Sequence, residues 1–258
     1  MKQVNQGGLK LWEFDSFAGE EGITHFVTDR DSGNDGIAFT LSYSSTPDKA
    51  AVARNRKRVA ESMGTTEDRF FLPSQVHKTR IVHVTSSTTK AELLETDALI
   101  TNEKGICIAV MSADCVPILL YDKKNSAVAA VHSGWRGTVA RILEKTLAEM
   151  HLRYGTIGQD IIAAIGPSVS QESYEVGGEV VEEINKAFGA GSGLLIPVAP
   201  PKAKLDLWKA NVIQLKAFGL LPEMIEVSNL CTVINNDHFF SARKGDNGRF
   251  AAGIMITN

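Results

Sequence analysis

Two short apolar runs joined by a polar turn constrain the fold of this chain more than any other stretch of its sequence. The runs extend from Val116 to Tyr121 and from Ala127 to Val131, and residues 122–126 between them read DKKNS. Apolar runs of this length around a polar turn are typical of two antiparallel strands that form a hairpin. Cys115 precedes the first run and His132 follows the second. The sequence therefore predicts that a thiol and an imidazole are neighbours at the open end of the hairpin.

The segment that follows His132 predicts a helix whose first turn favours an anion. Apolar side chains recur there at helical spacing, namely Val139, Ile142, Leu143, Leu147 and Met150. The helix is expected to begin at the turn 134–137, where free backbone N–H groups and the helix dipole attract negative charge. Arg136 adds a fixed positive charge whose fork suits phosphate or carboxylate.

Composition and charge exclude several classes of protein. The chain has 258 residues, of which 43% are hydrophobic and 22% charged, as expected for a globular protein. Its net charge of −3 provides no basic field for nucleic acid or for an anionic membrane surface. No apolar run approaches the roughly 18 residues that a membrane span needs. We therefore expect neither nucleic acid nor membrane as a partner.

The cysteines and the N-terminal residues indicate a cytoplasmic protein. The three cysteines, Cys107, Cys115 and Cys231, are an odd number, so a disulfide framework is not expected. The first residues, MKQVNQGGLKLWEF, contain no apolar core of a secretory signal. Each thiol is therefore core filler, a metal ligand or a nucleophile. Cys107 lies within a continuous apolar run and is most simply part of the core.

Strands and helices do not alternate regularly along the chain, which favours an α+β fold with mixed sheets. Besides the hairpin, strands are expected over Leu9–Phe14, Ile23–Thr28, Ile37–Tyr43, Phe70–Val76, Arg80–Val84, Asp97–Thr101, Gly105–Met111, Ile161–Ile165 and Ala251–Ile256. Further helices are expected after Gly177 and over the segment marked by Leu205, Trp208, Val212 and Leu215. No repeat or low-complexity segment divides the sequence, so residues 1–258 are expected to form a single domain.

A helix is also expected from Thr46 to Met63, because Thr46 supplies a capping hydroxyl and Pro47 suits the first helical position. This helix carries the basic residues Arg54, Arg56, Lys57 and Arg58. They are most simply a solvated face. The alternative is that one of these arginines reaches an anionic substrate.

Three chemistries fit the pair of Cys115 and His132. In the first, Cys115 is a nucleophile activated by a histidine, with Asp114 or another polar group orienting the base. In the second, Cys115 and His132 bind a metal ion together with His77, which stands at a strand end. One thiolate and two imidazoles around zinc leave a fourth position open, and such an ion lowers the pKa of bound water towards about 7. In the third, the thiol and the histidines are structural. Spacing alone leaves all three open.

Seven short motifs, in order along nearly the whole chain, make the sequence similar to the laccase-domain family, also called multicopper polyphenol oxidases. This family includes the bacterial peptidoglycan editing factors and the animal protein FAMIN. The motifs are Gln75-Val76-His77, Asp97-Ala98-Leu99-Ile100-Thr101, Ala113-Asp114-Cys115-Val116-Pro117, His132-Ser133-Gly134-Trp135-Arg136-Gly137, Ala164-Ile165-Gly166-Pro167, Cys231-Thr232 and Phe240-Ser241. The resemblance implies that His77, Cys115 and His132 bind one zinc ion. It also implies a layered α/β/β/α sandwich.

The sequence departs from the family pattern at four places. Lys78 replaces the usual Gly after the first histidine, and Ser168 replaces the usual Cys after Gly-Pro. The early Thr-Arg-x-Gly-Gly block reads TDRDSG at residues 28–33, and the late Arg-Arg-Asp-Gly block reads RKGD at residues 243–246. Substrate contacts within residues 28–36 and 241–249 are therefore not transferred from the family.

The resemblance implies purine nucleoside chemistry. Members of the family phosphorolyse adenosine, inosine and methylthioadenosine, with phosphate as co-substrate, and some deaminate adenosine. Arg136 is the first choice to hold the phosphate, followed by Arg243 and Arg249. Asp114 stands next to Cys115 and is a candidate to move a proton, or alternatively to orient a histidine that binds zinc.

Two other functions remain open at the level of the sequence. The peptidoglycan editing members share the same motifs, so the chain is alternatively a zinc or cysteine amidohydrolase that edits cell-wall precursors. A non-catalytic metal-binding module is a further alternative. Multicopper oxidation is disfavoured, because several coppers need many histidine ligands and the chain has six histidines in total.

Overall fold

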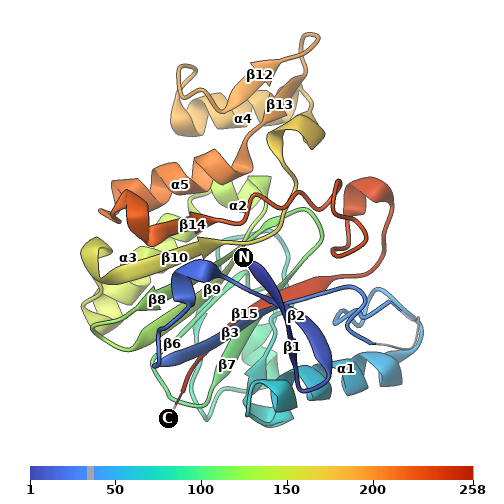
Figure 1. Ribbon diagram of the computed structural model, residues 1–258. Coiled ribbons are helices and arrows are strands. Elements are labelled where there is room, and N and C mark those ends of the chain that lie inside the picture. Colours follow the sequence, from blue (N-terminus) through green and yellow to red (C-terminus); the bar gives the residue numbers. More distant parts are fainter. Residues whose placement is uncertain (34–37, 258) are drawn as a thin grey trace.

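The computed structural model describes residues 1–33 and 38–257, and its centre is a pair of facing mixed β-sheets (Figure 1). The first sheet has the strand order β1 (Lys2–Gln6), β2 (Leu9–Glu13), β3 (Ile23–Thr28), β15 (Phe250–Ile256), β7 (Cys107–Ser112), β4 (Phe70–Phe71). The second has the order β14 (Ile225–Val227), β10 (Ile161–Ile165), β8 (Val116–Asp122), β9 (Ala127–Ser133), β6 (Ala98–Thr101), β5 (Ile81–His83). A small third sheet contains β11 (Glu175–Val176), β13 (Ala203–Leu205) and β12 (Leu195–Pro197).

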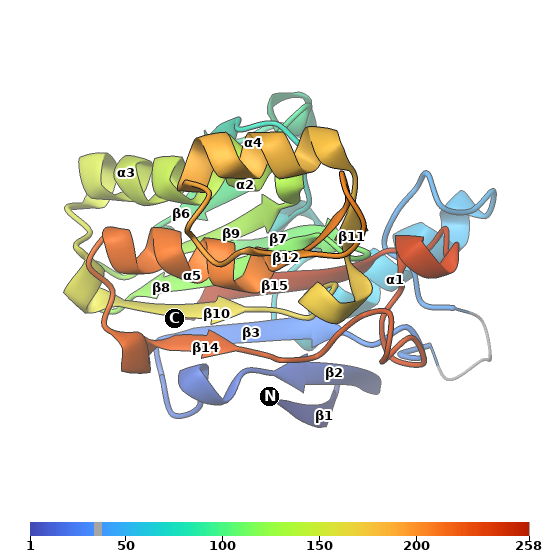
Figure 2. The same ribbon diagram turned by 90° about the horizontal axis from the view of Figure 1, so that it is seen from above.

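Helices cover the outer face of each large sheet. The helix α1 (Lys49–Ser62) packs on the first sheet. The helices α2 (Trp135–Val139), α3 (Ile142–Tyr154), α4 (Gly178–Phe188) and α5 (Leu207–Ala217) lie on the side of the second sheet (Figure 2). This order of layers confirms the predicted α/β/β/α sandwich with mixed sheets. Among the described residues, no helix has both the length and the apolar character that crossing a membrane requires.

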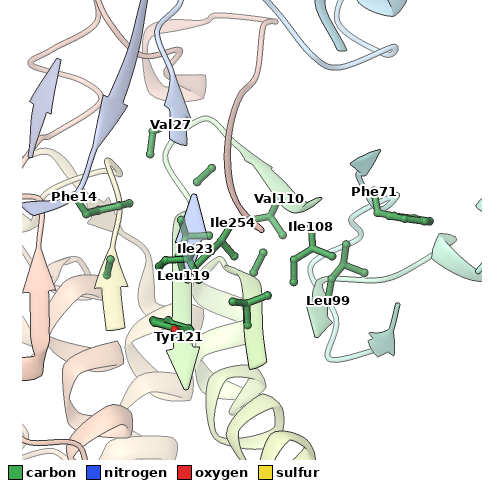
Figure 3. Close-up of a cluster of buried hydrophobic side chains, with 14 of the residues drawn as sticks. Phe14, Ile23, Val27, Phe71, Leu99, Ile108, Val110, Leu119, Tyr121 and Ile254 are labelled. Carbon is green, nitrogen blue, oxygen red and sulfur yellow. The ribbon is translucent and has the colours of Figure 1, made fainter. Parts of the chain in front are cut away.

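The strands at the centre are buried on both faces. Along β8, Leu119 and Tyr121 point into the core between the two sheets, while Ile118 and Leu120 pack against the helices. Figure 3 shows Leu119 and Tyr121 among the other side chains of the core between the sheets. Because such a strand has no polar face, it reads in the sequence as one unbroken apolar run.

The strands β8 and β9 form the predicted antiparallel hairpin. Val116 lies opposite Ser133, and Pro117 lies opposite His132. The turn is closed by the Asp122 carboxylate, which accepts hydrogen bonds from the backbone N–H groups of Lys124 at 3.1 Å and Asn125 at 3.0 Å. A short acid at the first position of a turn commonly makes these bonds. The hairpin thus sets Cys115, just before β8, beside the end of β9.

Two predicted strands differ in the structure. Residues 38–43 form no strand, and residue 37, like residues 34–36 of the predicted polar loop, lies outside the described residues. The segment is held instead by single hydrogen bonds, such as that from the Leu41 backbone N–H to the Arg249 carbonyl at 3.1 Å. The strand expected over 70–76 ends at Phe71, because Pro73 has no N–H to continue the ladder.

Two predicted helices also differ. The N-cap of α1 is Asp48, whose Oδ1 accepts from the Ala51 backbone N–H at 2.8 Å, so this helix begins after Pro47. The single helix expected after His132 is divided into α2 and α3. The division occurs at Arg141, which adopts the left-handed conformation with φ of 62° and so cannot continue a right-handed helix. The predicted N-terminal anion site therefore belongs to a helix of five residues.

His25 in β3 makes folding stability depend on pH. Its Nε2 accepts a hydrogen bond from the Phe14 backbone N–H at 2.8 Å, and the rings of Phe14 and Phe17 pack against it. Burial lowers the pKa of His25 from 6.5 to about 4. The unfolded chain thus takes up this proton near pH 6.5 and the folded chain only near pH 4. The stability contributed by neutral His25 is complete above pH 6.5 and is lost as pH falls through this window.

We expect the unaltered chain to lose about 3 kcal/mol more unfolding free energy than His25→Gln when the pH falls from about 7 to about 4. Glutamine keeps an acceptor for the Phe14 N–H but does not titrate. Urea denaturation of both chains at several pH values measures the difference. Equal losses in the two chains would show that His25 does not carry this dependence.

Candidate metal centre

Three side chains from separate segments converge at the open end of the β8–β9 hairpin. They are His77, Cys115 and His132, and their ligand atoms all lie within 4.8 Å of one another. Cys115 directly precedes β8, His132 lies in β9, and His77 comes from the loop between β4 and β5. The two imidazole rings are edge to face, with centroids 4.9 Å apart. The structure thus brings together the three residues that the sequence nominated as metal ligands.

A buried carboxylate, that of Asp97, holds both histidines. Its oxygens accept hydrogen bonds from the His132 ring Nδ1 at 2.9 Å and from the backbone N–H of His77 at 2.9 Å. Burial opposes the ionisation of Asp97, but these bonds lower its pKa. The sequence pattern assigned Asp97 only to a strand, and it offered Asp114 as the residue that orients a histidine. The available signal was an acid just before a wholly buried strand, because such an acid needs partners.

Cys115 and His132 favour each other's charged form. Burial opposes a thiolate, but the positive charge of His132 and hydrogen bonds from both histidines lower the pKa of Cys115 to about 6. Burial likewise opposes an imidazolium, but the Cys115 sulfur and the Asp97 carboxylate raise the pKa of His132 to about 9. The site therefore supplies a thiolate at neutral pH, which is the form that binds a metal.

The residues present fit a single zinc ion. One thiolate and two imidazoles are the ligand types that zinc prefers, and three protein ligands are the number found in its catalytic sites. The space between the ligands is also kept clear by Gly134. A Cβ at Gly134 would lie 2.8 Å from the Cys115 Sγ and 3.1 Å from the His77 Cδ2. No side chain other than hydrogen therefore suits this position.

A cavity of about 530 Å³ opens onto the three candidate ligands. It is large enough for a small polar substrate, since ligand sites commonly measure about 300–1,000 Å³. Its other polar lining includes Ser42, Gln75, Tyr174, Arg243 and Arg249. Arg54 and Arg58 of α1 line a different cavity, of about 500 Å³, which contains none of the three ligands.

Asp114 connects the metal ligands to the cavity wall. Its side chain is buried, and its two oxygens accept hydrogen bonds from the Thr232 hydroxyl at 2.6 Å and from the Arg243 backbone N–H at 2.7 Å. Asp114 also adopts the left-handed region with φ of 89°. Both oxygens are thus engaged in fixing loops, and the structure places this carboxylate as a tether for Arg243.

Two of the three predicted substrate arginines line the cavity. The Arg243 guanidinium lies 4.7 Å over the Tyr174 ring and donates from Nη2 to the Glu175 carbonyl at 2.9 Å. Arg249 curls onto its own loop, donating from Nη1 to the Gly248 carbonyl at 2.7 Å. Each guanidinium thus has a backbone partner, and both residues line the cavity that contains the candidate ligands.

The structure does not bring Arg136 to this cavity. Its side chain is exposed on α2, and its guanidinium lies 4.3 Å over the Trp135 ring. The sequence favours Arg136 as the phosphate ligand because it predicts that one long helix begins there. With that helix divided and Arg136 stacked on its neighbour, Arg243 and Arg249 take precedence.

Comparison with known proteins agrees with the resemblance seen in the motifs. The family model described as multi-copper polyphenol oxidoreductase laccase matches residues 24–257. A purine nucleoside phosphorylase of Bacteroides thetaiotaomicron is 40% identical over 96% of both chains. Adenosine deaminase RL5, from an unknown prokaryotic organism, is 36% identical over 95% of this chain and 98% of its own.

Solved structures agree with these sequence relatives. YlmD from Geobacillus stearothermophilus superposes with a TM-score of 0.88 at 30% identity, covering 97% of each chain. The hypothetical protein YfiH from Bacillus licheniformis also gives a TM-score of 0.88, at 26% identity, covering 98% of this chain and 97% of its own. The layered arrangement of sheets and helices is thus shared along almost the whole chain.

Proposed function

Because this chain belongs to the family described as multi-copper polyphenol oxidoreductase laccase, whose relatives are named for purine nucleoside reactions, we propose that it is a zinc-dependent purine nucleoside phosphorylase. Its proposed substrates are adenosine, inosine and methylthioadenosine, with phosphate as co-substrate, and adenosine deamination is proposed as a second activity. We expect it to act in the cytoplasm, since each of its cysteines is a free thiol in the described residues.

The observation that carries this proposal is a single cavity lined by the candidate zinc ligands and by two arginines. A zinc ion held by His77, Cys115 and His132 would supply a Lewis acid to a substrate oxygen. Arg243 and Arg249 line the same cavity and suit the charge and shape of phosphate. This combination fits a reaction between an anion and a polar nucleoside.

Phosphorolysis joins a phosphate oxygen to ribose C1′ while the bond from C1′ to the purine nitrogen breaks, leaving its electron pair on the base. The arginines would hold the phosphate beside C1′ and offset its charge. Burial raises the pKa of Tyr174 to about 12, so its hydroxyl remains a hydrogen-bond donor at neutral pH. We propose that Tyr174 orients the nucleoside and that Asp114, through the Arg243 backbone, keeps that arginine in place.

A multicopper oxidase is disfavoured for this chain despite the description of its family. Several copper ions need many histidine ligands. The chain has six histidines, and in the part that the structure describes a single group could hold a metal, with two histidines and one cysteine.

Incubation with inosine, with and without phosphate, tests the proposed function. We expect hypoxanthine and ribose 1-phosphate to form only when phosphate is present. Release of ammonia from adenosine, with no phosphate-dependent product from any nucleoside, would support the proposed deaminase activity and contradict the proposed phosphorylase activity. No turnover of any nucleoside would remove the proposal altogether.

A second candidate function is supported by a chain of side-chain contacts from Cys115 through His132 to Asp97. In this chain a thiol contacts an imidazole, and a buried carboxylate orients that imidazole. This order suits a cysteine amidohydrolase, such as one that edits peptidoglycan precursors. Release of an amino acid from a muramyl peptide precursor, without nucleoside turnover, would favour this candidate over the first.

Arg243→Ala is expected to lower kcat/KM for inosine phosphorolysis about 10- to 100-fold, since a hydrogen bond to a charged group contributes about 1.5–3 kcal/mol. The zinc content should not change, because Arg243 is not a candidate ligand. Arg136→Ala is the matched control and should stay within about twofold, since Arg136 lies outside the cavity. Saturation curves in phosphate measure both. A larger loss in Arg136→Ala than in Arg243→Ala would reverse this assignment.

A further inference from the structure

The carboxylate of Asp97 is the point at which the two histidine-bearing segments are joined. Asp97 is fully buried. Besides the His132 ring and the His77 N–H, its Oδ2 accepts from the backbone N–H groups of Val76 at 3.2 Å and Lys78 at 2.9 Å. Its own carbonyl accepts from the His132 backbone N–H at 2.8 Å. Asp97 thus accepts hydrogen bonds from three consecutive backbone N–H groups of one segment. It also accepts from the ring and from the backbone N–H of His132 on another segment.

The three N–H bonds explain the backbone at His77. This residue adopts the left-handed region with φ of 62°, which an L-residue with a ring side chain rarely occupies. Turning three successive N–H groups towards one anion requires such a sharp bend. Without the carboxylate, nothing among these contacts would hold the bend, and the His77 ring would leave its position opposite Cys115.

The bond to the ring sets the tautomer of His132. An ionised carboxylate only accepts hydrogen bonds, so Nδ1 of His132 must carry the proton. The proton on Nδ1 leaves the lone pair of the neutral ring on Nε2, the second nitrogen. A histidine that donates its other ring N–H to a carboxylate is oriented and made more basic as a ligand.

We propose that Asp97 is the positioning residue that assembles the metal site, because it fixes His77 through its backbone and His132 through its ring. Asp97 thereby sets two of three ligands before any ion arrives. The inference rests on the metal site of the proposed function and does not depend on the substrate. Zinc binding by the unaltered chain distinguishes a failure of this inference from a failure of the proposed function. If the unaltered chain binds no zinc, the proposed metal site is wrong whatever the role of Asp97.

Asp97→Asn tests this role, because the amide has nearly the same shape but presents one NH₂ group to N–H donors. Asp29→Asn is a matched control. Asp29 is equally buried, and its carboxylate also accepts from a histidine Nδ1, that of His238 at 2.8 Å, and from the Trp12 Nε1 at 3.0 Å. Asp29 does not line the cavity with the three candidate ligands. Both variants lose a buried carboxylate, but only the Asp97 carboxylate is bonded to candidate metal ligands.

Competition with a chromophoric chelator measures zinc affinity. We expect Asp97→Asn to bind zinc about 10- to 100-fold more weakly than the unaltered chain, the usual cost of losing a residue behind a ligand, and Asp29→Asn to be unchanged. At saturating cobalt(II), Asp97→Asn should keep the thiolate charge-transfer band of Cys115 and should change the visible d–d bands, which report the coordination geometry. Zinc affinity and cobalt spectrum equal to those of the unaltered chain would overturn the proposal.

A measurement on the unaltered chain keeps the proposal testable if Asp97→Asn does not fold. Correlation of proton and nitrogen signals from the histidine rings reports which nitrogen of each ring carries the proton. We expect the zinc-loaded chain to show His132 with its proton on Nδ1. A proton on Nε2, with Nδ1 bare, would contradict the role given to Asp97.

Discussion

Cys115→Ala is expected to lower bound zinc well below one ion per chain and to lower inosine phosphorolysis roughly a thousandfold or more. The thiolate is the anionic member of the three candidate ligands, and His77 and His132 alone form a two-ligand site. Loss of a Lewis acid removes several kcal/mol of transition-state stabilisation, and each 1.4 kcal/mol corresponds to about tenfold in rate. Elemental analysis and a phosphorolysis assay on the same preparation measure both effects.

The control for this substitution is Cys231→Ser. Cys231 is also buried, and its sulfur accepts from the Ser170 backbone N–H at 3.4 Å, a bond that a serine oxygen can replace. It does not line the cavity with Cys115. We expect Cys231→Ser to keep both zinc and activity. If Cys115→Ala instead keeps its zinc but loses activity, Cys115 is a nucleophile and not a ligand.

Gly134→Ala is expected to weaken zinc binding about 10- to 100-fold, with a comparable loss of activity, as for other changes directly behind metal ligands. The added Cβ would lie 2.8 Å from the Cys115 Sγ and 3.1 Å from the His77 Cδ2, closer than carbon can approach either atom without displacement. The backbone of Gly134 has φ of −73°, which alanine adopts freely. The effect is therefore steric and confined to the ligands.

Gly177→Ala controls for the general effect of replacing a glycine. Gly177 also directly precedes a helix and has φ of −83°, and a Cβ there meets nothing within 4 Å. Isothermal titration of the metal-free chains with zinc compares the variants. We expect Gly177→Ala to match the unaltered chain. Equal zinc affinity of Gly134→Ala and Gly177→Ala would mean that the three side chains do not bind the ion together.

The hairpin and many of the strands and helices could be predicted from the sequence because their signals are local, whereas the order of the layers was implied by the resemblance to the family. One apolar run ends at Tyr121 and the next begins at Ala127. The turn between them contains Asp122, the acid that closes it, and this residue is visible in the sequence. Strands buried on both faces appear as unbroken apolar runs, and the helix of residues 142–154 shows its buried face at helical spacing. Such patterns depend only on neighbours along the chain.

The candidate site depended on contacts between distant residues. His77 could be nominated by residue type and by resemblance, but its position depends on a left-handed bend held by Asp97, which is 20 residues away. The tether from Asp114 to the Arg243 backbone spans 129 residues. No local pattern reports either contact, so the sequence alone reveals neither the bonds of Asp97 to both histidine segments nor the tether of Arg243.

At Arg136 a local pattern predicts more than the structure contains. The apolar spacing after His132 indicated one helix with an anion at its start, but Arg141 interrupts it with a left-handed residue. Arginine rarely adopts the left-handed region, whereas Gly and Asn do so more readily, so an arginine at this position gives no sign in the sequence that the helix is interrupted. The consequence is that Arg136 stacks on Trp135 at the surface.

The most direct test of the account is to remove metal from the unaltered chain and to follow inosine phosphorolysis during titration with zinc. We predict that the metal-free chain is inactive, and that activity rises in proportion to added zinc up to one equivalent per chain and then stays constant. Full activity without zinc, or activity restored only by several equivalents of copper, would contradict the claim that His77, Cys115 and His132 form a single zinc site for nucleoside chemistry.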